Sequence, residues 1–224
     1  MENPTSLFPP PETWPADGPL ACGGGLTVER LVDAYSRGIF PWPVSSGPRG
    51  LLWWSPDPRG ILDLDRLHVP QRLQRTIRSG RFTLSTDRAF EAVVRGCAAS
   101  GSRRGNTWIT PAMIAAYRRL HEAGVCHSVE VWRDGTLAGG LYGVSIGGMF
   151  AGESMFSLER DASKVALCRL AVAVREAGCG LFDVQLVSPH LEQFGATAVS
   201  RKSFLERLAA AIRGPACWPP AFGE

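Results

Sequence analysis

A glutamate and an aspartate–glutamine pair are the side chains in this sequence whose types and spacing best suit chemistry on an amine. Glu153 lies in the stretch AGESMF, while Asp183 and Gln185 lie in LFDVQLVS. Residues two apart in a strand point to the same face, so we expect Asp183 and Gln185 to share a face opposite to their immediate neighbours. The pair could handle a proton and orient a nucleophile. Asp183 could equally be a structural carboxylate whose buried charge needs partners, and spacing alone leaves both open.

Two tryptophans at the edges of expected loops could contact a planar ligand. Trp54 ends the run LLWW, and Trp108 lies in TWIT. Most such residues fill a core or form a lid. A pair of them could instead stack a nucleobase, an interaction of about 1–3 kcal/mol per base.

Four arginines recur at intervals of three in and after the run PQRLQRTIRSGRF: Arg72, Arg75, Arg78 and Arg81. Positions three apart drift only slowly around a helix, so these side chains are expected to share one broad face. A charged face is usually just solvated. No acidic residue lies between Gln71 and Thr86, however, and this favours contact with the phosphates of a nucleic acid.

Histidines and cysteines do not form a metal or nucleophile motif in the sequence. The six cysteines are scattered, without a Cys-x-x-Cys pair or a histidine spacing suited to zinc. None of the four histidines lies beside a serine or cysteine in a recognisable nucleophile motif. We therefore expect no disulfide framework, no bound metal and no histidine-driven covalent mechanism.

Composition places the chain among ordinary globular proteins. Of its 224 residues 45% are hydrophobic, and the net charge is only +3, with 22 Arg against 2 Lys. No run of about 18 apolar residues occurs, so we expect no membrane-spanning segment. The proline-rich first twenty residues lack the basic and apolar regions of a signal peptide, so a cytoplasmic protein with reduced thiols is expected.

The three candidate catalytic residues lie in the second half of the chain, where an antiparallel meander, a helix and a further strand are predicted. Alternating apolar residues and glycine turns predict strands over 129–132, 137–145 and 149–156, a helix over 161–177 and a strand over 181–187. This pattern predicts an α+β fold. It is the order of the second half of an N-acetyltransferase-like domain, which is a comparison of folds and not of functions.

The first part of the chain is predicted to form a separate small unit. Thr27 can cap a helix that ends near Ser36, and LLWW is strand-like. The stretch GIFPWP is expected to interrupt regular structure, and SPDPRG to form a turn. We place a boundary near residue 62, which gives a small N-terminal domain over 1–62 and a catalytic domain over 63–224.

An ordered set of motifs resembles the bacterial leucyl/phenylalanyl-tRNA–protein transferase family. The motifs are YSRGIFPW (35–42), LLWWSPDPRGIL (51–62), TWIT (107–110), HSVEVW (127–132), GGLYGV (139–144), GESMFS (152–157), ASK (162–164) and FDVQ (182–185). The resemblance extends from about Leu20 to Leu208. Each motif alone is a weak signal, whereas the ordered set is a specific one.

The resemblance implies a small N-terminal domain followed by an acetyltransferase-like domain. It implies transfer of Leu or Phe, and less well Met, from aminoacyl-tRNA to the α-amine of a protein that begins with Arg or Lys. The product would be an N-degron that marks the protein for degradation. Members of the family work in the cytoplasm without metal or ATP, and we expect a monomer without a cofactor. Because an aminoacyl ester is already activated, the enzyme must chiefly position the reactants and stabilise the developing oxyanion.

The resemblance also implies catalytic and tRNA-binding roles for the residues singled out above. Asp183 and Gln185 match the catalytic pair of the family, in which the aspartate acts through the glutamine on the attacking amine. Glu153 matches an active-site glutamate that holds an amine or ribose group. Trp54 and Trp108 match aromatic residues associated with the terminal adenosine, and the four arginines match a basic patch for the tRNA acceptor stem.

An apolar pocket for the donor amino acid is the third implied feature. The matching positions are Leu141, Phe150, Met155, Leu170 and Phe182. Leu141 stands where Met is usual in the family, and this exchange nearly conserves volume. Leu170 stands where Phe is usual, so the pocket is expected to have extra room.

Two further functions remain open from the residues alone. An acetyl-CoA-dependent N-acetyltransferase needs a glycine-rich loop before a helix for the pyrophosphate, and the stretch SLERDASK lacks one. A non-catalytic tRNA-binding module needs only the basic face and the aromatic residues, and Asp183 would then be structural.

Overall fold

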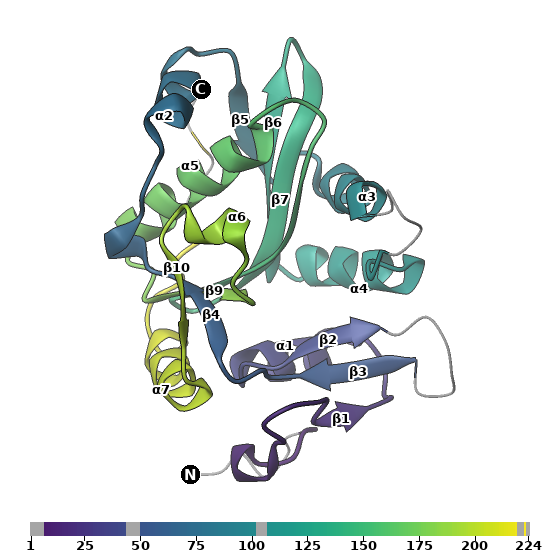
Figure 1. Ribbon diagram of the computed structural model, residues 1–224. Helices are drawn as coiled ribbons and strands as arrows, with labels where there is room; N and C mark the ends of the chain where they lie inside the picture. Colours follow the sequence, from purple (N-terminus) through teal and green to yellow (C-terminus); the bar gives the residue numbers. More distant parts are fainter. Residues whose placement is uncertain (1–6, 44–49, 102–106, 219–221, 223–224) are drawn as a thin grey trace.

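Two sheets organise the chain in the computed structural model, which describes residues 7–43, 50–101, 107–218 and 222 (Figure 1). The small sheet has three strands in the order β1-β3-β2, and the large sheet has seven in the order β10-β4-β9-β8-β7-β6-β5. Within the large sheet β8 and β9 are parallel, while the other neighbouring pairs are antiparallel. The predicted α+β class is confirmed.

Strands and helices alternate irregularly along the chain. The strands are β1 (Ala21–Cys22), β2 (Phe40–Pro43), β3 (Leu51–Trp54), β4 (Arg59–Leu62), β5 (Thr83–Thr86), β6 (Cys126–Arg133), β7 (Thr136–Ile146), β8 (Met149–Ser157), β9 (Leu181–Gln185) and β10 (Ala196–Val199). The α-helices are α1 (Val28–Ser36), α2 (Gln71–Arg78), α3 (Phe90–Gly101), α4 (Pro111–Glu122), α5 (Ala162–Glu176), α6 (Pro189–Glu192) and α7 (Arg201–Ala211). Two short 3₁₀ helices cover Pro11–Thr13 and Leu64–Arg66.

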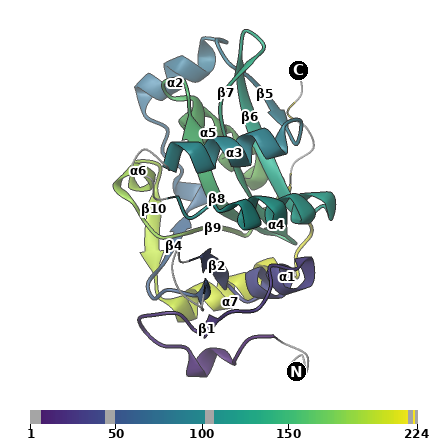
Figure 2. The same ribbon diagram turned by 90° about the vertical axis from the view of Figure 1, so that its right-hand side faces the viewer.

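Helices cover both faces of the large sheet. In Figures 1 and 2, α5 lies against one face with α2 beside it, and α3 and α4 lie against the other. Each face has its own apolar core, with α5 packed into one and α3, α4 and α1 into the other. No helix within the described ranges is long and apolar enough to cross a membrane.

The predicted meander of β6, β7 and β8 is confirmed, and its turns explain why. Asp134 and Gly135 both have positive φ (49° and 76°), as a two-residue hairpin turn requires. Gly147 has φ 54°, and a Cβ there would collide with the backbone of Ile212. The chain then crosses over through α5 to place β9 parallel to β8, so the acetyltransferase-like order of meander, helix and strand is confirmed as well.

The N-terminal part contains the predicted helix and one strand where we expected irregular structure. The Thr27 side chain accepts a hydrogen bond from the amide of Arg30, so it caps α1 as predicted. The expectation that GIFPWP breaks regular structure is wrong, because Phe40–Pro43 form β2. Strand β2 is an edge strand of the small sheet, and an edge strand tolerates prolines that cannot donate to a neighbour.

Strand β4 carries the chain from the small sheet into the large one. The expected turn over SPDPRG is wrong at its end, because Arg59 and Gly60 already belong to β4. That strand pairs with β9 on one side and β10 on the other. The division of the chain at residue 62 remains a proposal, and the pairing of β4 favours a boundary just before Arg59.

Candidate active site

An apolar cavity of about 110 Å³ opens between the central strands of the large sheet and the helices α5 and α6. Its lining residues are Leu141, Tyr142, Phe150, Gly152, Glu153, Ser154, Met155, Leu167, Phe182, Val184, Gln185 and Leu191. The volume is of the same order as an engineered apolar cavity of about 150 Å³ that binds benzene. Among these residues, Glu153 contributes the carboxylate and Gln185 the side-chain amide.

Glu153 reaches the cavity because the pairing of β7 and β8 shifts beside it. Gly143 lies opposite Gly152, and Tyr142 lies opposite Ser154, so Glu153 is the extra residue of a β-bulge. A bulge bends its strand and re-aims a side chain, and bulges are common next to active sites. The bulge places the Glu153 carboxylate beside Gln185 on the neighbouring strand.

A hydrogen-bond chain holds the Glu153 carboxylate from two sides. The Tyr117 hydroxyl donates to Oε2 at 2.7 Å, and Gln185 Nε2 donates to Oε1 at 3.0 Å. The hydroxyls of Tyr117 and Tyr35 lie 2.6 Å apart in the core behind. Burial raises the pKa of Glu153 to about 7 despite these hydrogen bonds, so this carboxyl can change its protonation state near neutral pH.

Gln185 ends strand β9 in a left-handed conformation, with φ 57°. The predicted alternation, with Asp183 and Gln185 on one face, is therefore wrong at Gln185, because this backbone turn redirects the side chain. Gln185 lines the cavity together with its neighbour Val184, whereas Leu186 is 56% exposed. Sequence periodicity assumes extended backbone throughout, so it could not reveal the turn.

Asp183 points into the protein, where Arg59 binds both of its carboxylate oxygens. Arg59 Nε donates to Oδ1 at 2.9 Å and Nη2 donates to Oδ2 at 2.6 Å, and both side chains are almost fully buried. The backbone N–H of Gln185 also donates to Oδ1 at 2.9 Å. Asp183 does not belong to the cavity wall, and its contact with the site passes through the backbone of Gln185.

Arg59 was not among the residues singled out from the sequence. Its Nη1 donates to the carbonyl of Gly38 at 2.8 Å, and its guanidinium lies over the rings of Phe40 and Phe204. It thus connects the N-terminal part, α7 and β9. A buried carboxylate needs a cationic partner, so the Asp183 assignment was the available signal, but the sequence contains 22 arginines and does not say which one pairs.

Aromatic residues form the open side of the site. Trp42 and Trp108 stack with ring centroids 5.5 Å apart and an interplanar angle of 17°, and they line a hollow that also includes Glu153 and Gln185. Trp54 lines an adjoining apolar hollow on the other side of Trp42. Its Nε1 is buried without a hydrogen-bond partner among the described residues.

Trp54 and Trp108, which we singled out as a pair, thus lie in two hollows that share Trp42. Sequence reasoning missed Trp42, although it lies in the motif YSRGIFPW. The structure brings Trp108 toward Glu153 and Gln185, and it keeps Trp54 further along the same open side.

Four of the five residues expected to form the aminoacyl pocket line the cavity: Leu141, Phe150, Met155 and Phe182. Leu170 does not line it and is fully buried in the core. The α5 residue at the cavity is Leu167, one turn earlier on the same helix. Sequence reasoning also missed Val184 and Leu191. Leu167 and Leu170 are three residues apart on one helix, and this spacing was the signal that Leu167 could take the place of Leu170 in the pocket.

The four arginines of the predicted basic face are all exposed, but they do not belong to one helix. Arg72, Arg75 and Arg78 lie on α2, which ends at Arg78. Arg81 follows a turn at Gly80, lies over the Phe82 ring and donates to the carbonyl of Arg160. Among the ion pairs of the described residues, none involves these four arginines.

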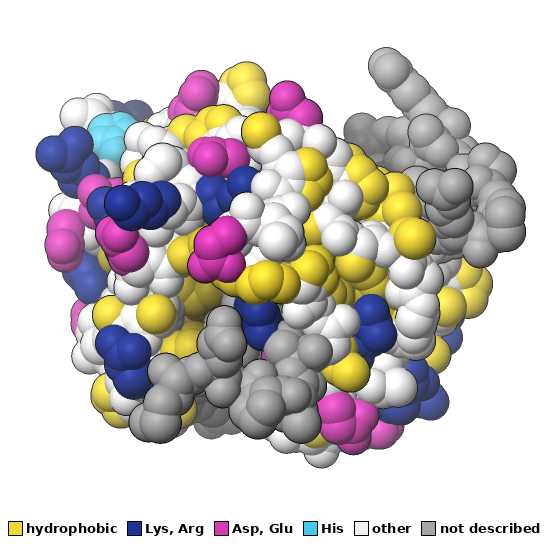
Figure 3. Space-filling view, turned by 90° about the horizontal axis from the view of Figure 1, so that it is seen from below, with side chains coloured by type: hydrophobic (Ala, Val, Ile, Leu, Met, Phe, Trp, Pro, Cys, Tyr) yellow, Lys and Arg dark blue, Asp and Glu magenta, His cyan; other side chains and the backbone are white. Residues whose placement is uncertain are grey.

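The basic segment and the small sheet lie at opposite ends of the molecule in Figure 1. Seen from the end of the small sheet, the surface carries charges of both signs interspersed with apolar side chains (Figure 3). The surface in that view thus differs from α2 and the residues after it as far as Thr86, whose charged side chains are all arginines.

Two family models match this chain. The model described as "Leucyl/phenylalanyl-tRNA protein transferase" matches residues 61–209, and the model of its N-terminal domain matches residues 24–57. Leucyl/phenylalanyl-tRNA–protein transferase of Anaeromyxobacter sp. (strain K) is 52% identical over 210 residues, which cover 93% of this chain and 89% of that one. The transferase of Thiobacillus denitrificans is 51% identical over 212 residues, which cover 94% and 92%.

Solved acetyltransferases resemble the chain more distantly. The ribosomal-protein-alanine N-acetyltransferase of Brucella melitensis biovar Abortus 2308 matches with 12% identity and a TM-score of 0.36. The match covers 64% of this chain and 98% of that one. At this TM-score the likeness says nothing about activity.

Proposed function

The chain belongs to the leucyl/phenylalanyl-tRNA–protein transferase family, and we propose that its apolar cavity receives the side chain of a Leu or Phe residue carried by tRNA. The protein is an aminoacyltransferase that moves an amino acid from aminoacyl-tRNA to a protein. The single observation that supports the proposal for the cavity is that an apolar space for one side chain ends at the Glu153–Gln185 pair. Met would enter the same cavity less well.

The reaction in this site is aminolysis of an ester. The α-amine of the acceptor attacks the ester carbonyl, a C–N bond forms, and the C–O bond to the terminal ribose breaks. The amine loses a proton, and the ribose oxygen gains one. A free α-amine has a pKa of about 7.7–8.0, so a useful fraction is already neutral near physiological pH.

Glu153 is the group we assign to the amine proton. Its pKa of about 7 lets the carboxylate accept a proton near neutral pH and return it to the leaving ribose oxygen. Its carboxylate lies at the junction of the apolar cavity and the Trp42–Trp108 hollow, where the donor ester and the acceptor amine would meet. The Tyr117 hydroxyl and the side-chain amide of Gln185 hold the carboxylate in place.

Gln185 orients the reactants in this proposal, and Asp183 positions Gln185. The Gln185 Nε2 amide can donate to the developing oxyanion as well as to Glu153, and its carbonyl oxygen can accept from the amine. Asp183 has both oxygens bound by Arg59 and accepts from the Gln185 amide, which helps to hold the left-handed turn. Because these bonds occupy both of its oxygens, we assign Asp183 the role of fixing geometry.

The terminal adenosine of the tRNA is placed against the tryptophans. Trp108 and Trp42 line the hollow beside the Glu153–Gln185 pair, and the ring of Trp54 lines the next hollow. Stacking on one such ring contributes about 1–3 kcal/mol per base. The exposed arginines Arg72, Arg75, Arg78 and Arg81 are assigned to the phosphates of the acceptor stem.

The acceptors in this proposal are proteins that begin with Arg or Lys, and the product is an N-degron. This part of the proposal is supported by membership of the family rather than by a contact in the site. We further propose that the protein works in the cytoplasm, as a monomer and without a cofactor.

An assay with labelled Leu-tRNA and Phe-tRNA and peptides that begin with Arg, Lys, Asp or Glu tests this function. We expect transfer to the two basic peptides from both donors and none to the acidic pair. Acetyl-CoA with the same peptides serves as the control for an acetyltransferase. Transfer to the acidic peptides alone would overturn the acceptor assignment, and acetylation without aminoacyl transfer would overturn the function.

A further inference from the structure

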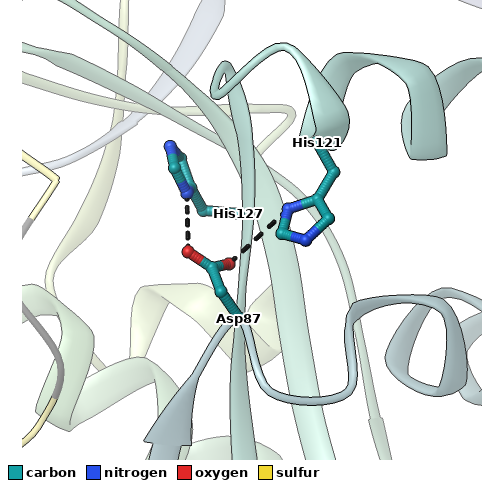
Figure 4. A group of neighbouring side chains, drawn as sticks. All are labelled: Asp87, His121 and His127. Carbon is teal, nitrogen blue, oxygen red and sulfur yellow. Dashed lines mark hydrogen bonds and ion pairs between the residues drawn. The ribbon is translucent and has the colours of Figure 1, made fainter.

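A carboxylate and two imidazoles converge at a second place, on the side of the large sheet where β5 turns into α3. Asp87 follows β5, His121 lies in the last turn of α4, and His127 lies in β6 (Figure 4). One ligand atom from each residue can be chosen so that all three lie within 4.8 Å of one another. The three side chains are partly exposed, at 29%, 26% and 14%, so a solute can reach them.

Neighbouring groups fix the orientation of each side chain in this cluster. The ring of His121 stacks on Phe90 with centroids 4.2 Å apart, and that of His127 stacks on Trp218 at 4.5 Å. The amide of Ser128 donates to Asp87 Oδ1 at 2.8 Å. Rings and a carboxylate that are held in this way resemble metal ligands, which need support from surrounding groups.

We propose that Asp87, His121 and His127 form a binding site for a divalent transition-metal ion of the Zn²⁺ class. Two imidazole nitrogens and one carboxylate oxygen are a common protein donor set for zinc, with a fourth position left for water. The site departs from the expectation of no metal, which rested on sequence spacing and on the family resemblance. His121 and His127 are six residues apart on different elements, and Asp87 is far from both, so no local motif could reveal the cluster.

The distances agree with such an ion after small rotations. Asp87 Oδ2 lies 2.8 Å from His127 Nδ1, and Asp87 Oδ1 lies 3.8 Å from His121 Nδ1. Ligands about 2.0–2.2 Å from one ion in tetrahedral geometry are separated by distances between these two values. Arg88, the basic residue next to Asp87, lies over the ring of Trp132, so its charge is directed toward that ring.

Metal binding would replace hydrogen bonds that now hold the cluster. The Nδ1–H of His127 donates to Asp87, and that of His121 donates to the carbonyl of Cys126 at 2.8 Å. On binding, each imidazole would present the lone pair of Nδ1 to the ion and carry its N–H on Nε2. The Cys126 carbonyl is then free to accept from another donor or to approach the ion.

The proposed site lies behind one wall of the aminoacyl cavity. The ring of Trp218 stacks both with that of His127 and with that of Phe150, with ring centroids 5.7 Å apart in the second pair. Phe150 lines the cavity. A bound ion would therefore fix the ring of His127, on which Trp218 stacks, without contacting the substrates.

Binding of Zn²⁺ alone to the full chain tests the proposal. The protein is freed of metal with EDTA in a Cys22→Ser background, which removes the exposed thiol, and is then titrated against a chromogenic chelator. We expect one zinc ion per chain. Asp87→Asn and His121→Gln should each weaken binding by at least about tenfold, because even loss of a supporting group costs metal affinity of that order.

His68→Gln is the matched control, because His68 is exposed and lies outside the cluster. His121→Gln leaves the Asp87–His127 hydrogen bond intact, so it keeps the test decisive if Asp87→Asn does not fold. Zinc should raise the Tm of the wild type and of His68→Gln but not of folded His121→Gln. A wild type that binds no zinc, or variants that bind it as the wild type does, would reduce the cluster to a hydrogen-bond network and overturn the proposal.

Discussion

Glu153 and Asp183 are carboxylates on neighbouring parallel strands, yet they meet opposite surroundings. Glu153 faces a cavity and two neutral hydrogen-bond donors, whereas Asp183 faces the guanidinium of Arg59. Environments that differ in this way separate the roles of two acidic groups. We therefore assign the proton transfer to Glu153, whose pKa burial raises to about 7, and a positioning role to Asp183, which is paired with Arg59.

The raised pKa of Glu153 makes the stability of the fold depend on pH. The folded protein keeps a proton on this group up to about pH 7, while the ordinary value is 4.5. Burial of the charged form is thus a destabilising contribution that is absent below pH 4.5 and fully present above about pH 7. Glu153→Gln removes it, so we expect the Tm of the variant to rise relative to wild type between about pH 5 and pH 8. Thermal melts across this range check the prediction, and a constant Tm difference would contradict it.

Sequence reasoning found the three catalytic candidates but not their orientations. Residue types and the family resemblance pointed to Glu153, Asp183 and Gln185. The bulge at Glu153 and the left-handed turn at Gln185 arise from pairing with β7 and from the contact with Asp183. The bulge is set by the register of β8 against β7 and the turn by a single left-handed residue, and the alternation of residue types specifies neither.

At the scale of elements, α5 contributes Leu167 to the wall of the cavity that we assign to the donor amino acid. Leu167→Phe should narrow the cavity and lower kcat/KM for Phe-tRNA more than for Leu-tRNA, because the larger donor side chain loses its space. One methylene in such a pocket alters discrimination by about 10–200-fold, so a change of at least about tenfold is expected. Competition between the two donors measures the ratio.

Leu170→Met is the control for the α5 variant. Leu170 is buried one turn away from Leu167, and the exchange nearly conserves volume. The donor ratio should stay at the wild-type value. A ratio that shifts with Leu170→Met and not with Leu167→Phe would show that the cavity has been assigned to the wrong residue of the helix.

Helix α2 is the element that we assign to the tRNA phosphates. Arg72→Gln with Arg75→Gln should raise KM for aminoacyl-tRNA and reduce the salt dependence of binding by about one unit of slope per lost contact. Arg207→Gln on α7 is the control, because Arg207 is also exposed on a helix. Binding measured at several salt concentrations would speak against this surface if the double variant kept the wild-type slope.

Hairpins between neighbouring strands were predicted better than strands that pair across long stretches of sequence. The hairpins of the meander follow from Asp134-Gly135 and Gly147-Gly148, whose turn chemistry acts over a few residues. Strands β4 and β10 were missed. Strand β4 pairs with β10 on one side and with β9 on the other, in both cases across more than a hundred residues, and the short sequences of β4 and β10 carry no periodic signal.

At the scale of the whole molecule, Arg59 is the residue on which the N-terminal part, α7 and β9 converge. It binds Asp183, the carbonyl of Gly38 and the ring of Phe204. Through these contacts Arg59 connects the N-terminal part of the chain with β9, which carries Asp183 and Gln185. Its strand β2 supplies Trp42 to the open side of the site.

Arg59→Leu should reduce the free energy of unfolding by about 3–5 kcal/mol, because it leaves the Asp183 carboxylate buried without its cation. The double variant Arg59→Leu with Asp183→Leu should recover part of this loss, since no buried charge remains. Denaturant unfolding of the wild type, Arg59→Leu, Asp183→Leu and the double variant measures these values. A double variant that is as unstable as the sum of its single variants would show that the pair is not coupled.

The most direct measurement is single-turnover transfer of Phe from Phe-tRNA to a peptide that begins with Arg, with Gln185→Ala and Glu153→Gln. Both side chains line the cavity, and both variants keep the buried Arg59–Asp183 pair. We therefore expect both variants to fold. We expect the transfer rate to fall by about 10²–10³ in Gln185→Ala and by a similar factor in Glu153→Gln. The Kd for Phe-tRNA should stay close to wild type. Transfer at the wild-type rate in both variants would contradict the assignment of this cavity as the site of peptide-bond formation.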